Sequence, residues 1–163
     1  MIRALKLSIF APTLGHSTGS LLYIRTWILF IIREFDLRIL LIAIAGAIGA
    51  VSRYGLSSFI SNQFGEKFAL GTLAVNVIGC FLIGFVMHLA LSTDIISEQT
   101  RIAVTVGFLG ALTTFSTFGY ETLKYIDDRA WLMAASNVVL NVACGLLATI
   151  LGLIIAKALV GGS

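Results

Sequence analysis

Residues 107 to 121 read Gly-Phe-Leu-Gly-Ala-Leu-Thr-Thr-Phe-Ser-Thr-Phe-Gly-Tyr-Glu, and they fill an otherwise hydrophobic segment with glycine and hydroxyl side chains. Glycine weakens a helix, and serine and threonine hydroxyls compete with the regular helical hydrogen bonds by bonding to nearby backbone. Irregular backbone at membrane depth persists only where protein buries it or where it lines a water-filled cavity. The stretch therefore predicts a broken membrane helix that marks a functional site.

The composition around this stretch is that of an integral membrane protein. Hydrophobic residues make up 58% of the 163 residues, charged residues make up 12%, and the mean hydropathy is +1.01. These values exclude an ordinary soluble domain and a disordered chain. Four apolar stretches have roughly the 20 residues that one helical crossing needs, and the third contains the quoted stretch. We therefore expect an all-α membrane protein with four transmembrane helices, at about residues 39–60, 70–91, 102–120 and 130–156.

The charged and cysteine residues narrow the set of partners. The net charge is +3, but the basic residues are scattered through short loops and the N-terminal stretch. Because they form no cluster, we expect the lipid bilayer as the neighbour and no nucleic acid. Cys80 and Cys144 lie in separate apolar spans without a second metal-ligating residue at suitable spacing, which favours a packing role.

The first 36 residues precede all four spans. Between Arg25 and Arg33 the apolar run is too short to cross a bilayer, and the small residues of a signal cleavage site do not follow it. Two interpretations remain open, an interfacial basic helix and an upstream start that the folded unit does not need. The predicted organisation is a leader of unknown role at 1–36 and a four-helix domain at 37–163.

Polar side chains within the spans are the first candidates for a site. Arg53 either snorkels to a helix end or meets water or a carboxylate inside the membrane. Asn76 either joins two helices by a hydrogen bond or contacts a permeating solute or ion. Asn137 and Asn141 lie one turn apart in the fourth span, and such a polar stripe is not expected to face lipid.

Phe115 and Phe118 lie three residues apart and therefore on the same face of any helical turn. Phenylalanines at this spacing usually only pack. Beside a break in the backbone, however, their ring edges could line a cavity, and ring edges carry the positive part of the aromatic quadrupole. The pair is thus a candidate for contact with an anion.

Three stretches together resemble one family, the fluoride channels called Fluc or CrcB. They are Gly46-Ala-Ile-Gly-Ala-Val-Ser-Arg-Tyr54, Gly71-Thr-Leu-Ala-Val-Asn-Val-Ile-Gly79 and Gly107 to Phe118, and the resemblance covers about residues 38–156. It implies a multi-pass protein of the cell (inner) membrane that is not an enzyme and exports fluoride passively, protecting against fluoride toxicity. It also implies an antiparallel, dual-topology homodimer with two pores and a structural sodium ion (Na+) at its centre.

The resemblance assigns roles residue by residue. The backbone carbonyls of Gly110 and Thr113 would hold the sodium ion, and Arg53 and Glu121 would belong to a vestibule or gate. The sequence departs from the usual pattern at Leu109, Ala111 and Gly119. The implied pore and fluoride contacts are Asn76, Phe115, Phe118, Ser116, Thr117, Asn137 and Asn141.

The charges flanking the four spans support insertion in both orientations. From Arg38 onward, three basic residues fall on each side of the membrane, so the positive-inside rule sets no firm orientation. The two sets are Arg38, Arg101 and Lys157 on one side and Lys67, Lys124 and Arg129 on the other.

Two other classes of function compete with this interpretation. A small multidrug-type cation exporter would couple protons through a carboxylate in its first span, where this chain has Arg53 and no acid. A non-transporting assembly factor would use the polar residues only to join helices. An enzyme is disfavoured because no nucleophile, base and orienting group fall at usable positions.

Overall fold

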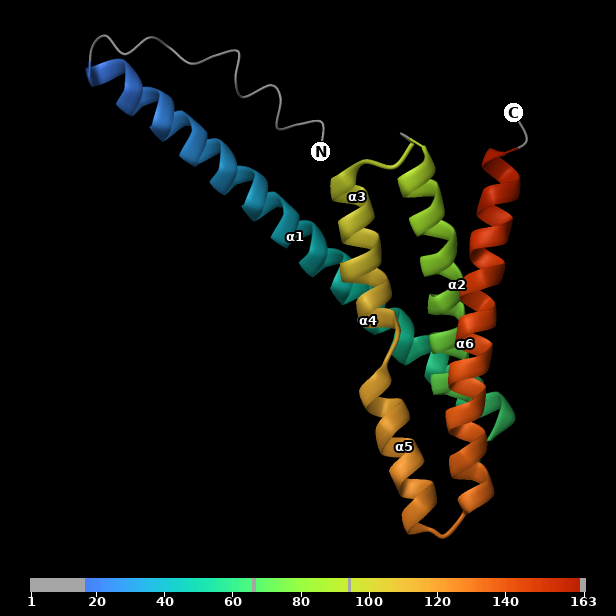
Figure 1. The fold of residues 1–163 in the computed structure, drawn as a ribbon. Coiled ribbons are helices and arrows are strands. Elements are labelled where there is room, and N and C mark those ends of the chain that lie inside the picture. The colour runs from blue at the N-terminus through green and yellow to red at the C-terminus, as the bar shows by residue number, and fades with distance from the viewer. Residues whose placement is uncertain (1–16, 66, 94, 162–163) are drawn as a thin grey trace. The chain divides into compact units, whose positions relative to one another are not determined.

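A computed structural model describes residues 17–65, 67–93 and 95–161, and it divides into two compact units, Met1–Leu37 and Arg38–Ser163. The described residues form helices and the turns between them (Figure 1). The helices are α1 (Ser17–Phe64), α2 (Leu70–Ser92), α3 (Glu98–Ile102), the π-helical segment η2 (Ala103–Leu109), α4 (Gly110–Leu112), α5 (Phe115–Asp127) and α6 (Trp131–Val160).

Four stretches are long and apolar enough to cross a membrane, which confirms the predicted all-α fold with four spans. They are Leu37–Phe64, Leu70–Ser92, Glu98–Asp127 and Trp131–Val160. The third span is longer than predicted at both ends, so the expected loops at 92–101 and 122–129 are wrong in extent. Its start is capped by Ser97, whose hydroxyl accepts from Thr100 N at 3.2 Å. Its last helix continues to Asp127, just before the turn at Arg129, whose φ is positive, at 59°.

The turn between α1 and α2 shows why the first span ends where it does. Gly65 adopts a φ of 82°, the left-handed conformation that terminates many helices, and its N–H donates to Ser61 O at 2.9 Å. The first helix therefore runs to Phe64, past the end at residue 60 that the sequence predicted.

The predicted break in the third helix is present, but threonines and not glycines occupy it. Thr113 (φ −84°, ψ 155°) and Thr114 (φ −147°, ψ 114°) are extended, whereas Gly110 keeps helical angles. The Thr113 hydroxyl donates to Leu109 O at 2.9 Å and closes the helix before the break. The Thr114 hydroxyl accepts from Thr117 N at 3.2 Å and opens α5 after it.

Helices α2 and α6 lie side by side along their length (Figure 1) and approach closely through small residues. A Cβ atom added at Gly84 would collide with the Thr149 carbonyl oxygen, and one at Gly152 would collide with the Phe81 carbonyl oxygen. Such backbone-to-backbone approach is how helices associate where no hydrophobic effect drives them together. The sequence predicts a seam of small residues on the fourth span, at Gly145, Ala148 and Gly152, and the structure confirms it, since all three are buried.

The second half of α1 packs on η2, also through glycines. A Cβ at Gly49 would collide with the Phe108 carbonyl oxygen, and one at Gly107 would lie 2.8 Å from Ile42 O. The small residues at three- and four-residue steps in the first span, Ala43, Gly46, Ala47 and Ala50, predict a face for close helix contact, but Ala43 and Ala47 are exposed. The packing face is therefore rotated toward Gly49, because only glycine permits this approach of two backbones.

Residues preceding the first span are partly described. Ser17 to Phe64 form one continuous helix, while Arg3 and Lys6 of the predicted leader lie outside the described residues. Tyr23 and Trp27, one turn apart, make an edge-to-face ring contact at 5.9 Å and are about half exposed. The role of this segment stays a prediction.

Candidate functional site

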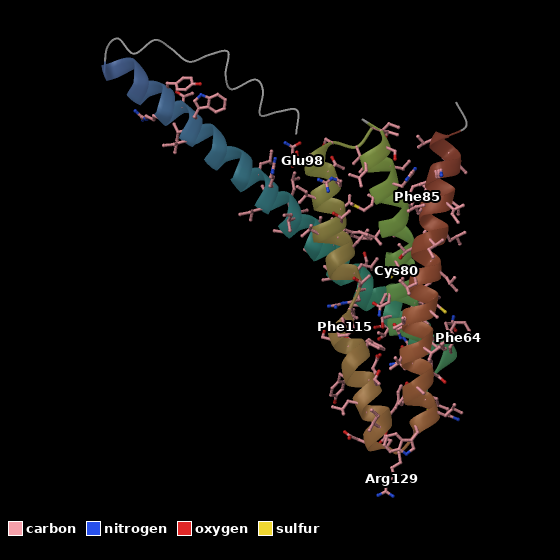
Figure 2. All side chains as sticks on the ribbon, in the orientation of Figure 1. Phe64, Cys80, Phe85, Glu98, Phe115 and Arg129 are labelled. Atoms are coloured by element: carbon pink, nitrogen blue, oxygen red, sulfur yellow. The ribbon has the colours of Figure 1, made fainter. Side chains whose placement is uncertain are left out.

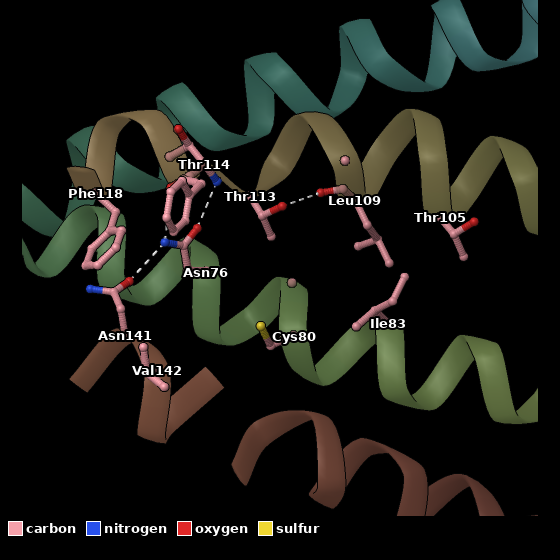
Figure 3. Close-up of a pocket in the computed structure, with 13 residues that line it drawn as sticks. Asn76, Cys80, Ile83, Thr105, Leu109, Thr113, Thr114, Phe118, Asn141 and Val142 are labelled. Atoms are coloured by element: carbon pink, nitrogen blue, oxygen red, sulfur yellow. Dashed lines mark hydrogen bonds between the residues drawn. The ribbon is translucent and has the colours of Figure 1, made fainter. Parts of the chain in front are cut away.

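Asn76 of α2 satisfies the backbone that the break leaves unpaired. Its Oδ1 accepts from Thr114 N at 2.8 Å, and its Nδ2 donates to Thr114 O at 3.3 Å (Figure 3). Backbone polar groups inside a membrane need such partners when helical bonds are missing. The Asn76 amide therefore bonds both backbone polar groups of the extended residue Thr114. Of the two roles considered for Asn76, hydrogen bonding between spans is thus present, and it is made at the break.

Further hydrogen bonds extend from Asn76 across three helices. Asn76 Nδ2 also donates to Asn141 Oδ1 at 2.9 Å, and Asn141 Nδ2 donates to Asn137 Oδ1 at 3.0 Å. Asn137 is fully buried, and its Nδ2 donates to Thr122 Oγ1 at 2.9 Å. The Thr122 hydroxyl donates to Phe118 O at 2.8 Å. We call this series, from Asn76 through Asn141 and Asn137 to Thr122, the amide chain.

A cavity of about 360 Å³ adjoins the break (Figure 3). Asn76 and Asn141 contribute amides to its lining, and Phe115 and Phe118 contribute rings whose centroids are 5.4 Å apart. Phe118 is buried, whereas Phe115 is 83% exposed in the single chain. Phe115 lies at the start of α5, directly after the break (Figure 2). The rest of the lining is largely apolar and consists of Gly79, Cys80, Ile83, Thr105, Leu109, Gly110, Thr113, Thr114 and Val142.

A second cavity of about 220 Å³ lies on another side of Thr114, which lines both cavities. Arg53 is the charged side chain in its lining and is half-buried. The second cavity therefore combines a cation with hydroxyl donors, which suits an anion. Its other lining residues are Tyr54, Ser57, Ser58, Thr72, Val75 and Thr117.

Glu121 contacts the second span and not the amide chain. The buried Thr72 hydroxyl donates to Glu121 Oε1 at 2.6 Å. The other carboxylate oxygen, Oε2, is buried and has no hydrogen-bond partner among the residues that the structure describes. Glu121 thus lies one turn after Phe118 on α5. It is adjacent to the wall of the second cavity because its bond partner Thr72 lines that cavity.

The carbonyls of Gly110 and Thr113 lose their usual helical donors at the break. In a continuous helix Thr114 N would donate to Gly110 O, but here it donates to Asn76 Oδ1. Likewise Thr117 N, the expected donor to Thr113 O, bonds to the Thr114 hydroxyl. Gly110 is exposed and Thr113 half-exposed. The usual helical donors of both carbonyl oxygens therefore bond to other acceptors.

The structure thus brings most of the predicted site residues to the break. Asn76, Asn141, Phe115 and Phe118 share one cavity, and Arg53 and Thr117 share the other. Ser116 is exposed beside them. Two residues were not given a part from the sequence: Thr72 and Thr122. Thr114 belongs to the hydroxyl residues that predicted the break, and the structure shows that it is also the N-cap of α5.

Four membrane-spanning helices around an internal polar break define a multi-pass membrane protein with a site for a small polar solute or ion. Residues 40–153 match the family described as "CrcB-like protein, Camphor Resistance (CrcB)". The chain belongs to this family, as its motifs predicted.

Individual relatives agree with the family match. A protein of Geotalea uraniireducens is 49% identical over 121 residues, which are 74% of this chain and 98% of the relative. One of Citrifermentans bemidjiense is 48% identical over 118 residues, 72% of this chain and 95% of the relative. One of Sorangium cellulosum is 39% identical over 121 residues, 74% of this chain and 95% of the relative. Each is named "Fluoride-specific ion channel FluC".

Proposed function

We propose that this chain is a passive, fluoride-selective ion channel that exports fluoride across the cell membrane and protects against its toxicity. Its relatives are named as fluoride-specific ion channels, and we assign it no enzymatic reaction. The observation that carries the proposal is the helix break held by Asn76, with the paired rings of Phe115 and Phe118 beside it. A membrane-embedded break is tolerated where protein buries it or where it lines a cavity, and this break adjoins one.

Fluoride recognition would rest on short, fixed donors. Fluoride is small and strongly hydrated, so it must exchange water for donors such as amides and hydroxyls. Both Asn76 amide hydrogens have acceptors within the chain, Thr114 O and Asn141 Oδ1, and fluoride would replace one of them. Phe118 would add a ring edge. Because these donors are held by packing, the larger chloride ion should be rejected.

The approach to the constriction would run through the second cavity. Arg53 would attract the anion into the second cavity. The Thr117 hydroxyl would then donate a hydrogen bond to it on the way to the break, where Ser116 adds another hydroxyl. Glu121 would act at this end as a vestibule or gating residue, through its bond with Thr72. Each contact is weak on its own, which lets the ion leave as readily as it enters.

The working unit would be an antiparallel homodimer. Phe115, Ser116 and Thr117 are exposed on the single chain although they belong to a membrane span. The hydroxyls of Ser116 and Thr117 share one partner, Thr114 Oγ1, at 3.3 and 2.9 Å. Exposed hydroxyls are costly against lipid, so a second copy is the natural cover for this face. The balanced flanking charges support dual topology, and labelling of a Lys67→Cys variant in intact cells from only one side of the membrane would exclude it.

A structural sodium ion would sit between the two copies. The carbonyls of Gly110 and Thr113 would hold it, each copy supplying one pair, since both carbonyls have lost their helical donors. Unwound carbonyls are the usual ligands of sodium in membrane proteins. When bound, the cation would supply positive charge that holds the two breaks together.

Gly110→Val should prevent assembly of the dimer. A Cβ at Gly110 would meet only Thr105 O, at 3.7 Å, so the single chain has room for it. A loss of assembly with normal insertion would therefore point to the partner copy or to the carbonyl geometry. We expect the variant to insert and to run as a monomer in size-exclusion chromatography. Thr113→Ser, which keeps the carbonyl, is the matched control and should dimerise. A dimeric Gly110→Val protein would contradict the proposed interface.

The function itself is tested by ion efflux from liposomes that contain the purified protein. Fluoride should leave rapidly without any added energy source, and chloride should stay inside. Comparable chloride efflux, proton-driven cation transport, or the absence of any flux would each refute the proposed function. The last two outcomes would favour the exporter and the assembly factor, respectively.

A further inference from the structure

We propose that Thr122 is a positioning residue that fixes the orientation of the Asn76 amide through Asn137 and Asn141. The inference rests on the proposed function, because it treats Asn76 as a fluoride ligand. Thr122 lies on α5 one turn after Phe118 and lines neither of the two cavities described above. Its effect on fluoride would therefore be exerted entirely through the amide chain.

The amide chain has a defined direction because a backbone group ends it on each side. The Thr114 N–H can only donate, so Asn76 turns Oδ1 toward it, at 2.8 Å. The Phe118 carbonyl can only accept, so the Thr122 hydroxyl donates to it, at 2.8 Å. The single hydroxyl proton of Thr122 is then committed. Thr122 Oγ1 can therefore only accept from its other neighbour.

This acceptor sets each amide in turn. Asn137 directs Nδ2 to Thr122, at 2.9 Å, which leaves its Oδ1 to accept from Asn141, at 3.0 Å. Asn141 then has its own Oδ1 free to accept from Asn76, at 2.9 Å. Reversing any one amide would set donor against donor or acceptor against acceptor. The two ends thus impose the same direction on all three asparagines.

Removing the hydroxyl would release this constraint at its far end. Asn137 is fully buried, so water cannot replace the acceptor that Thr122 provides. Its amide would gain by rotating toward another partner. Asn141 Nδ2 would then lose Asn137 Oδ1 and keep the Asn137 backbone carbonyl oxygen, at 3.0 Å, so one bond instead of two would orient the Asn141 amide. Asn76 would spend part of its time with Oδ1 toward the cavity. An amide oxygen repels an anion, so binding of fluoride would weaken.

The test is Thr122→Val, which keeps the side-chain shape and deletes the hydroxyl. We expect the half-saturating fluoride concentration for efflux to rise about tenfold, the effect of about one lost buried hydrogen bond. A role in stability alone would lower the amount of assembled protein without changing this concentration. Thr122→Ser restores the hydroxyl and should behave as wild type. Should the valine variant fail to assemble, Thr122→Ala deletes the same hydroxyl without filling the space.

Thr149→Val is the matched control. The Thr149 hydroxyl also donates to the carbonyl four residues before it, Gly145 O at 3.0 Å, but it accepts from no amide in the described part of the chain. This variant should keep the wild-type fluoride dependence. An equal shift in Thr149→Val would show that the lost helical bond matters and would overturn the positioning role.

A double variant tests whether Thr122 acts through Asn137. In an Asn137→Ala background the chain is already cut, so adding Thr122→Val should change the half-saturating concentration no further. Effects that multiply would overturn the inference, as would wild-type behaviour of both Thr122→Val and Thr122→Ala. Wild-type protein that conducts no fluoride would refute the proposed function, and the positioning role with it.

Discussion

Phe118→Ile should lower fluoride efflux by about tenfold to a hundredfold, since each 1.4 kcal/mol of lost interaction corresponds to a factor of ten. Phe118 is buried, lines the cavity with Asn76, and lies 5.4 Å from the Phe115 ring. Isoleucine keeps an apolar side chain of similar bulk, so the fold should survive. It lacks the ring edge whose partial positive charge would stabilise a dehydrated anion. Efflux from liposomes, normalised to the amount of folded dimer, measures the loss.

Phe81→Ile provides the comparison for this substitution. Phe81 stacks on Phe85 at 6.3 Å on the second span and does not line either cavity described here. The same loss of a ring should therefore change fluoride efflux less than twofold, by the usual small effect of a volume-conserving swap. Full flux through Phe118→Ile, or an equal loss in Phe81→Ile, would be incompatible with a ring edge in the pore.

The four spans were predictable because each is a predominantly apolar stretch of bilayer length. Their ends were not, because the third span begins and ends with polar turns that look like loop sequence. Glu98 to Arg101 form its first turn since Ser97 caps them, and Lys124 to Asp127 stay helical up to the turn at Arg129. A polar helix end and a polar loop have the same composition, and only the capping bonds distinguish them.

The existence of the break was predictable, but its position depends on a residue far away in the sequence. Asn76 lies 38 residues before Thr114 and bonds both of its backbone groups, so the extended residue is the one that α2 can reach. The local sequence indicated the hydroxyl residues of the quoted stretch and Gly107 and Gly110 alike, and it did not decide between them. Gly107 serves close packing against Ile42 of α1, and Gly110 is helical. A glycine within a span of this chain can therefore mark a close contact between helices and not a break in the backbone.

The residue types that form the site could be predicted from the sequence, but most of the hydrogen bonds that join them could not. The one-turn spacing of Asn137 and Asn141 correctly indicated a shared polar face. The depth of that face was not accessible, because Asn137 becomes fully buried only when α5 packs beside α6. Thr122 carried no signal at all, since a threonine that bonds back to its own helix is ordinary in membrane spans.

Asn76→Asp should unfold much of the protein even though the two side chains have the same shape. The carboxylate can still accept from Thr114 N, but it cannot donate to Thr114 O or to Asn141 Oδ1. Thr114 O and Asn141 Oδ1, which accept hydrogen bonds from the Asn76 amide, would instead face a negative charge inside the membrane span. Each buried hydrogen bond left unmade costs roughly 1–3 kcal/mol, so we expect the free energy of unfolding to fall by about 3 kcal/mol or more. Fluoride efflux should fall with it, beyond the loss in Phe118→Ile.

Asn62→Asp makes the same chemical change where nothing depends on the amide donors. Asn62 lies in the last turn of α1 and is exposed, so its replacement should change stability by no more than about 0.5 kcal/mol. Denaturant titration of both variants in detergent micelles, at equal protein concentration, gives the two free energies of unfolding. If Asn76→Asp were as stable as Asn62→Asp, the break would be held by something other than the Asn76 amide. The assignment of the α2 asparagine as the residue that sets the position of the break would then fail.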